Sequence, residues 1–433
     1  MNIEISISVL ALLIIFWLVG CAYNHKKFPT TAPSSTEPDD FVIQIDDYGQ
    51  FWDGSASNHA FERVSKLSET SNVIVMLFVH GWNHDAAPDN QNLRDFSATV
   101  ADTRKRLIDT ANPESEVYRK SRKTLTGTES LSVVSIYIGW RGRSLPGFLN
   151  FATFWDRKAT AERVGEGDLR EFLGRLNTLY RKKRDLRASG NTDLFMGLTS
   201  FGHSFGGQVL LRSVAYEIEN ELLAKHAQPD TFRQQDEVND LMGFGDLVVL
   251  INPALEALQF ERIWRLSTSL KFGRQQNPVM LIVSSAGDIP RQILFPIGRN
   301  LDALLLRPNF RPGQRALWTQ ALGEYKPFLT HSIEIVKNSS QLTPGFDPSV
   351  YTSNPYAIKN LDLTNLPSIA GVRLIPTENH QSNNPFLIAH ASAGVVLDHS
   401  TVFEETLRKF LNDYIAIAQG KRMLTARSSL VCE

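Results

Sequence analysis

Ser204 lies in a segment, Gly202 to Gly206 (GHSFG), whose residue types can present a reactive hydroxyl. The apolar run DLFMGLTS precedes the segment and the amphipathic stretch GQVLLRSVAYEIENEL follows it, so the segment joins a predicted strand to a predicted helix. Glycines flank the serine because a Cβ atom at those positions would collide with neighbouring backbone in so sharp a turn. The turn lifts the hydroxyl out of the sheet, beside the amino-terminal end of the helix. This context predicts that Ser204 is a nucleophile.

A glycine also follows an earlier predicted strand. Val73 to Val79 leads directly into His80 to His84 (HGWNH), and a His-Gly-x sequence there lets the chain turn close to a substrate carbonyl. With these two motifs the sequence resembles an α/β-hydrolase fold serine hydrolase of the esterase and lipase kind. The order of the motifs covers roughly Phe41 to Tyr414.

The resemblance implies roles for several residues. The backbone N–H groups of Trp82 and Phe205 would form the oxyanion hole, which stabilises charge on the substrate oxygen. The family order of the catalytic residues is serine, then acid, then histidine. His80 precedes the serine, so we expect it to be a structural turn residue rather than the base. The chemistry implied needs neither a metal nor an organic cofactor.

Asp288 is the predicted acid, because it lies just past the end of a later predicted strand, Val279 to Ser284. A carboxylate there would orient the catalytic histidine and stabilise its protonated form. Glu256 is the alternative acid, four residues beyond the end of the preceding strand at Asn252. Asp288 could instead cap a helix before Ile289.

His399 is the predicted base, because the base should lie between the last strand and the final helix. It immediately precedes the amphipathic stretch VFEETLRKFLNDYIAIA. His390 is the alternative, but it lies within a predicted strand and fits a core or surface position better. His380 lies in a polar segment and we expect it to be exposed to solvent.

The elements that must position these residues alternate along the chain. Short apolar or β-branched runs alternate with longer amphipathic stretches, which is typical of an α/β fold. Runs such as VIVMLFV predict strands covered on both faces, as in a mostly parallel sheet with helices on both sides. The predicted strands are Phe41 to Ile45, Asn72 to Val79, Leu131 to Ile138, Asp193 to Ser200, Leu247 to Ile251, Val279 to Ser284 and Pro385 to Ala391. The predicted helices are Asn92 to Thr110, Asp168 to Ser189, Gly206 to Leu223 and Thr401 to Ala418.

Two regions look like insertions, near 148–187 and near 295–362, and we expect them to form lids or substrate walls. Two basic clusters, Arg119 to Lys123 and Arg181 to Arg184, could contact phosphate or lipid headgroups or could be solvated faces balanced by nearby acids. Gly139 to Arg143 could line the pocket, with Arg141 as an anion contact, or could be a turn with a packed tryptophan.

The amino-terminal segment is distinct from the rest. Ile5 to Gly20 carries no charge, and its sixteen residues are closer to the core of an export signal than to the roughly 20 that span a bilayer. The segment ends in Leu18 to Cys21 (LVGC), which resembles the lipobox of bacterial lipoproteins, where Cys21 would carry the lipid. Met1 to Glu4 has no Lys or Arg, so an uncleaved anchor is the alternative. Either one places the protein outside the cytoplasm, tethered to a membrane of the cell envelope.

We therefore expect a signal or anchor over residues 1–20, a flexible linker rich in Pro, Ser and Thr over 21–40, and a hydrolase domain over 41–433. The 433 residues include only two cysteines, which cannot form a disulfide framework. A formal net charge of −1 gives no long-range field to gather nucleic acid.

The expected function is a membrane-tethered hydrolase that cleaves a small-molecule or lipid ester, or a thioester, through an acyl-enzyme. The alternative is a scaffold or binding lipoprotein that kept the hydrolase fold without the activity. Reaction of Ser204 with a serine-directed phosphonate distinguishes the two.

Overall fold

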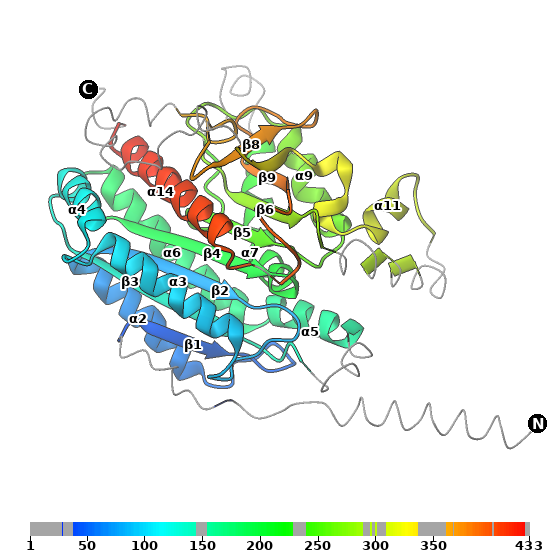
Figure 1. Ribbon diagram of the computed structural model, residues 1–433, viewed down its shortest axis with the longest axis horizontal. Coiled ribbons are helices and arrows are strands. Elements are labelled where there is room, and N and C mark those ends of the chain that lie inside the picture. Colours follow the sequence, from blue (N-terminus) through cyan, green and yellow to red (C-terminus); the bar gives the residue numbers. More distant parts are fainter. Residues whose placement is uncertain are drawn as a thin grey trace, which may run out of the picture.

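The computed structural model describes residues 28, 38–143, 154–227, 240–288, 295–296, 299–300, 309–336, 361–366, 368–400 and 402–428. Within them, nine strands form one sheet in the order β1-β3-β2-β4-β5-β6-β9-β7-β8 (Figure 1). Neighbouring strands are parallel, except that β7 and β8 are antiparallel. The strands are β1 (Asp40–Gln44), β2 (Asn72–Val79), β3 (Leu131–Gly139), β4 (Met196–His203), β5 (Leu247–Ile251), β6 (Met280–Ser285), β7 (His331–Ile335), β8 (Val372–Pro376) and β9 (Phe386–Ala391). The predicted α/β class with a mostly parallel sheet is confirmed.

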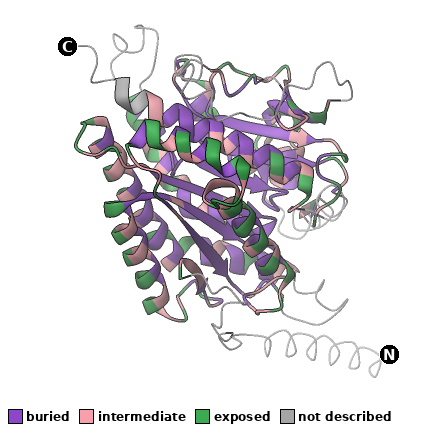
Figure 2. Ribbon diagram, turned by 60° about the vertical axis from the view of Figure 1, so that its left-hand side comes forward, coloured by how far each residue is buried: buried purple, intermediate pink, exposed green. Residues whose placement is uncertain are grey.

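Helices cover both faces of this sheet (Figures 1 and 2). One face packs against α2 (Gly54–Thr70), α5 (Phe154–Glu166), α6 (Asp168–Ala188), α7 (Phe205–His226) and α9 (Glu261–Thr268). The other face packs against α3 (Gln91–Leu107) and α14 (Glu405–Ser428), and α4 (Pro113–Thr126) packs beside α3. A group of short helical elements packs next to β6 and β9, which η4 contacts directly. It consists of α11 (Gln314–Thr319) and three 3-10 turns, η2 (Ala257–Gln259), η4 (Leu322–Glu324) and η5 (Lys326–Phe328).

Alternation along β2 explains how one strand serves both faces. Val73, Val75 and Leu77 belong to the core under α6 and α7, whereas Met76 and Phe78 belong to the core under α3. Successive side chains of a strand point to opposite faces, so an apolar residue at nearly every position requires cover on both. The helices meet that need, and their buried sides face the sheet (Figure 2).

Two predicted elements are displaced from their expected bounds. The fourth predicted strand, 193–200, is observed at Met196–His203, because β4 pairs with β5 as far as His203 opposite Ile251. The final helix begins at Glu405 rather than at 401 and continues to Ser428. The residues before this helix form the loop that contains His399. Because the helix begins later than expected, this loop is longer than the sequence predicts.

Several elements lie outside the predicted set, among them α2, α4, α5, β7 and β8. The helices α2 and α4 are rich in polar and charged residues, with few large apolar side chains, and this hides their apolar stripes. The strand β7 has the sequence HSIEI and β8 has VRLIP, and neither is the continuous apolar run of an inner strand. They pair in antiparallel orientation at one end of the sheet, where β8 is the edge strand.

Parts of the two regions that were expected to form lids or substrate walls belong to the sheet and its helical layer. Residues 154–188 form α5 and α6, which pack on the sheet face with α7, because apolar residues such as Leu169, Phe172 and Leu176 recur at helical spacing and are buried. His331–Ile335, within the second region, is a strand of the sheet. Residues 144–153, 301–308 and 337–360 lie outside the described part.

The predicted amino-terminal signal, the lipobox Cys21 and most of the linker also lie outside the described residues. Among the helices of the described part, none is long and apolar enough to cross a membrane.

Candidate active site

Ser204 occupies the turn between β4 and α7, with φ 53° and ψ −119°. A positive φ is strained for a residue with a side chain, and such strain is found where the surrounding structure fixes a functional residue. The turn is tight: a Cβ on Gly202 would lie 2.7 Å from the carbonyl oxygen of Gly206, and a Cβ on Gly206 would collide with the carbonyl oxygen of Val79. The glycines that flank the serine therefore have the steric reason expected from the sequence.

Three predicted site residues are brought together at the carboxyl edge of the sheet. The hydroxyl of Ser204 donates to His399 Nε2 over 2.9 Å, and His399 Nδ1 donates to Asp288 Oδ2 over 2.6 Å. Asp288 is completely buried and Ser204 is 3% exposed, whereas the His399 side chain is 20% exposed. The serine lies 195 residues before the histidine, and the acid 111 before it, so only the fold creates this contact.

Two residues that the sequence analysis did not single out hold the His399 loop. His203 Nε2 donates to the carbonyl oxygen of His399 over 2.9 Å, and Asn252 Nδ2 donates to the same oxygen over 3.2 Å. Asn252 also donates to the carbonyl of Asp398 and accepts from the N–H of Ser285, so it ties this loop to the end of β6. Asn252 has φ 46°, a conformation that asparagine tolerates better than most residues.

The protonation of His203 follows from its burial. Burial lowers the pKa of His203 well below its ordinary value, and the neighbouring His399 lowers it further. A neutral imidazole that donates from Nε2 carries its proton there. His203 is therefore a neutral donor that positions the loop.

The loop after β2 lies against the serine. A Cβ on Gly81 would lie 2.7 Å from the Cβ of Ser204 and 2.8 Å from the carbonyl oxygen of His203, so only glycine fits. Trp82 is the next residue, and Phe205 is the first residue of α7. The two predicted oxyanion donors thus come from the loop and the helix that flank Ser204.

His80 packs as a structural residue of this loop. Its ring stacks on Trp140 at 5.5 Å and 2° between planes, Nε2 accepts from the N–H of Trp140 over 3.0 Å, and Nδ1 donates to the carbonyl of Gly81 over 2.9 Å. Burial lowers the pKa of His80 to about 3. His80 stays neutral at ordinary pH and braces the loop against the segment after β3.

The segment after β3 supports the loop as well. The N–H of Asn83 donates to Gly142, and the N–H of Gly142 donates to His84, each over 3.0 Å. Arg141 forms an ion pair with the buried Asp47. Its charge is thus already paired with a carboxylate inside the protein, which fits the packed turn better than the anion contact.

The alternative residues lie elsewhere. His390 is on β9, with its ring nitrogen 3.6 Å from Glu324, and the His380 ring contacts His331 at 4.9 Å. Glu256 forms ion pairs with Lys158 at 3.1 Å and Arg299 at 2.8 Å. None of these hydrogen-bonds to His399 or Ser204.

Aromatic side chains gather beside the nucleophile turn. Phe154, at the start of α5, lies 4.9 Å from the ring of Phe205 and 5.3 Å from that of Trp82. Trp155 lies 6.4 Å from Phe295. These rings give the site an apolar wall. The sequence analysis expected the region near 148–187 to form a lid or a substrate wall, but it did not single out these rings.

Within the described residues, no group of three or more His, Cys, Asp or Glu side chains is arranged to hold a metal ion. Comparison with models of protein families, with curated proteins and with solved structures finds no match for this chain. The geometry alone therefore carries the functional argument.

Proposed function

We propose that this protein is a serine hydrolase of the α/β-hydrolase fold that cleaves a carboxylic ester or thioester. The observation that carries the proposal is the chain of hydrogen bonds from Ser204 through His399 to the buried Asp288. A serine, a histidine that can accept its proton and a carboxylate that orients the histidine are the parts of a catalytic triad. The mostly parallel sheet, with the serine at the turn after the inner strand β4, supports the same class.

The reaction has two halves. In the first, His399 Nε2 takes the proton of Ser204, whose oxygen attacks the substrate carbonyl, and the oxyanion accepts hydrogen bonds from the backbone N–H groups of Trp82 and Phe205. The protonated His399 then gives its proton to the leaving alcohol or thiol, and an acyl-enzyme remains. In the second half, a water loses a proton to His399 and attacks the acyl carbon. Ser204 leaves with that proton, and the carboxylic acid is released.

Burial gives Asp288 its role. The carboxylate accepts from Nδ1–H, which leaves Nε2 as the acceptor for the serine proton. When the imidazole becomes positively charged, the nearby carboxylate stabilises it. The apolar wall formed by Phe154, Phe205 and Trp82 suits an apolar group next to the scissile carbonyl.

A fluorescent fluorophosphonate tests this proposal on the full-length chain. We expect the parent protein to be labelled, and the Ser204→Ala and His399→Ala variants to lose labelling by at least a hundredfold, because the triad acts as a unit. His390→Ala is the matched control and should label like the parent. A well-folded parent that does not react would contradict the proposal and favour the scaffold alternative.

We also propose that the chain is anchored to a membrane of the cell envelope through Cys21. The lipobox-like end of the apolar amino-terminal segment supports this. Cys21→Ser should block lipid attachment and processing, which is measured by incorporation of labelled palmitate and by the mass of the mature chain. A variant whose mass and membrane fraction equal those of the parent would instead indicate an uncleaved anchor.

A further inference from the structure

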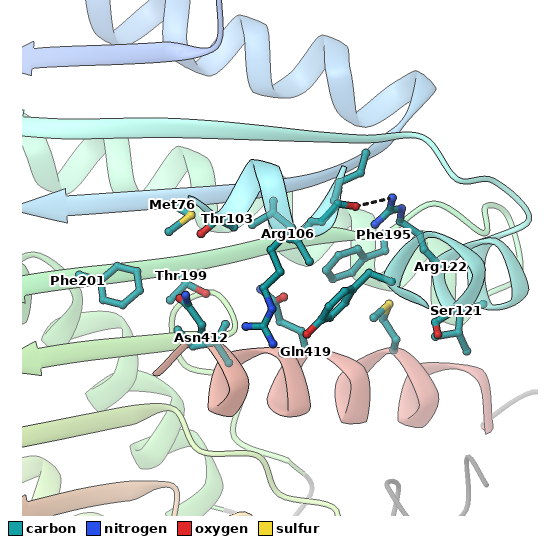
Figure 3. Close-up of a pocket in the computed structure, with 18 residues that line it drawn as sticks. Met76, Thr103, Arg106, Ser121, Arg122, Phe195, Thr199, Phe201, Asn412 and Gln419 are labelled. Atoms are coloured by element: carbon teal, nitrogen blue, oxygen red, sulfur yellow. Dashed lines mark hydrogen bonds between the residues drawn. The ribbon is translucent and has the colours of Figure 1, made fainter. Parts of the chain in front are cut away.

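A second candidate site lies on the face of the sheet under α3, α4 and α14. An apolar cavity of about 130 Å³ opens there, and the proposed reaction does not use it (Figure 3). Side chains of β2 and β4 form part of its lining, namely Ile74, Met76, Thr199 and Phe201. An engineered apolar cavity of about 150 Å³ in another protein admits benzene, so this one has room for a short apolar chain.

The cavity exists because the helical layer has a gap over the middle of the sheet. The core under α3 includes residues of β2 and β3, and the core under α14 includes residues of β5, β6 and β9. Strand β4 lies between these two groups of strands. Ile74 and Phe201 are only partly buried, although inner strands of a parallel sheet are normally covered on both faces. Apolar surface of the central sheet therefore faces this space.

A second apolar cavity lies farther along β4. A smaller cavity of about 30 Å³ shares Met76, Phe201 and Asn412 with the first one. It extends past Phe78 to Phe403, toward the carboxyl edge of the sheet. The lining residues of the two cavities follow β4 from Phe195 to Phe201, an extended arrangement that suits a chain better than a compact ring.

A cation lies at the edge of the cavity. Arg122 of α4 lines it, and its Nε and Nη2 donate to the backbone carbonyls of Glu129 and Leu107 over 2.9 and 3.2 Å (Figure 3). Within the part of the chain that the structure describes, no carboxylate forms an ion pair with Arg122, and its Nη1 donates to no protein group. By contrast, Arg106, the other lining arginine, is paired with Asp413 over 2.6 Å.

Glu129 is the carboxylate that acts on Arg122 and raises its pKa, but other cations share it. The side chain of Glu129 is shared by Arg119 at 3.3 Å and Lys123 at 3.5 Å. Burial lowers the pKa of Arg122 to about 10, so it remains a cation at neutral pH. A guanidinium with a free nitrogen at the edge of an apolar cavity is suited to a carboxylate whose chain enters that cavity.

We propose that this cavity binds a monocarboxylate with a short or medium alkyl chain, with its carboxylate at Arg122 and its chain along β4. The Arg122 end of the cavity is remote from Ser204. Phe195, at that end (Figure 3), lies just before β4 and Ser204 follows the end of β4, so roughly 30 Å of strand separates them at about 3.3 Å per residue. Phe201, at the other end, is only three residues before Ser204. The carboxylate position at Arg122 therefore does not depend on the proposed hydrolase activity.

The test is a titration of the full-length chain, in a neutral detergent, with octanoate carrying ¹³C at the carboxyl carbon. We expect saturable binding by the parent and at least tenfold weaker binding by Arg122→Gln, which removes the cation, and by Ala416→Phe, which fills the cavity. Lys120→Gln is the matched control, because Lys120 is in the same helix, pairs with Glu116 and does not line the cavity, and it should bind like the parent. Octan-1-ol should bind at least tenfold more weakly than octanoate.

Several results would overturn the proposal. Equal binding of octanol and octanoate, or unchanged binding in Arg122→Gln, would reject the carboxylate at Arg122. Unchanged binding in Ala416→Phe, or in Ala416→Leu if the larger substitution unfolds the protein, would reject the cavity. An absence of saturable octanoate binding, with Arg122-dependent binding to phosphatidylglycerol vesicles, would assign the cation to a lipid headgroup instead. Circular dichroism and the thermal midpoint of each variant check its folding.

Discussion

The carbonyl oxygen of His399 accepts hydrogen bonds from two side chains, and these fix the position of the histidine that is hydrogen-bonded to Ser204. His203 reaches it from the residue before the nucleophile, and Asn252 reaches it from the end of β5. Neither touches a reacting atom in the proposed mechanism. Both are positioning residues, because they act through the orientation of His399.

Removing the His203 contact should slow the reaction without weakening substrate binding. A buried hydrogen bond of this kind contributes about 1 kcal/mol, so we expect His203→Ala to lower kcat about fivefold, with KM little changed. His203→Gln retains an N–H donor and should recover part of the loss. Steady-state kinetics with a p-nitrophenyl ester provides the measurement. A rise in KM at constant kcat would argue against positioning and for a direct substrate contact.

At the scale of the elements, one buried carboxylate joins three segments around the site. Asp47, in the loop after β1, accepts from Arg157 of α5 over 3.0 Å and forms an ion pair with Arg141 after β3. Arg157 also donates to the carbonyl of Arg141 over 3.1 Å. Asp47 and Arg157 are essentially inaccessible to solvent. This network holds α5, with its aromatic residues, against the segment that braces the loop of Gly81.

We expect Asp47→Asn to destabilise the protein by about 3 to 5 kcal/mol, because it removes the buried carboxylate that Arg141 and Arg157 share, and Arg157 then keeps only its ion pair with Asp156. Asp46→Asn is the matched control: Asp46 only accepts from the N–H groups of Tyr48 and Gln50, and asparagine can do the same. The free energy of unfolding from urea titrations compares the two. If both variants had the same free energy of unfolding, the ion pairs of Asp47 would not stabilise the protein beyond the packing of its side chain.

At the scale of the whole molecule, buried neutral histidines link stability to pH. Burial lowers the pKa of His80 to about 3 and that of His331 to about 4, and it lowers the pKa of His203 well below its ordinary value. In the unfolded chain each of them titrates near 6.5. Below that pH the unfolded chain binds more protons than the folded protein, so folding stability falls as the pH falls.

The free energy of unfolding should therefore decrease between pH 6.5 and pH 4, by about 1.4 kcal/mol per pH unit for each such histidine. His331 is far from the nucleophile, and its Nε2 donates to the carbonyl of Thr364 over 2.7 Å. His331→Gln should reduce the slope of the free energy of unfolding against pH by about 1.4 kcal/mol per pH unit, which is the contribution of one histidine. Urea unfolding at pH 7.5, 5.5 and 4.5 measures the slope, and an identical slope in parent and variant would refute this assignment.

The sequence alone determined the features that depend on neighbours along the chain. Local sterics and the periodicity of strands and helices predict the mostly parallel sheet. They also predict the GHSFG turn, the glycine after His80, and the positions of Asp288 and His399 after strands. These signals lie within a few residues of each other, so they can be read without the fold.

Only the tertiary structure decided what depends on residues far apart in the sequence. No local sequence pattern predicts three of the observed contacts. They are the hydrogen bonds of His203 and Asn252 to His399, the ion pair of Asp47 with Arg157, and the antiparallel pairing of β7 with β8. The cavity beside Arg122 is likewise a gap between helices that pack on different strands. Packing and long-range hydrogen bonding choose these partners by three-dimensional proximity, which the spacing of residues along one chain does not contain.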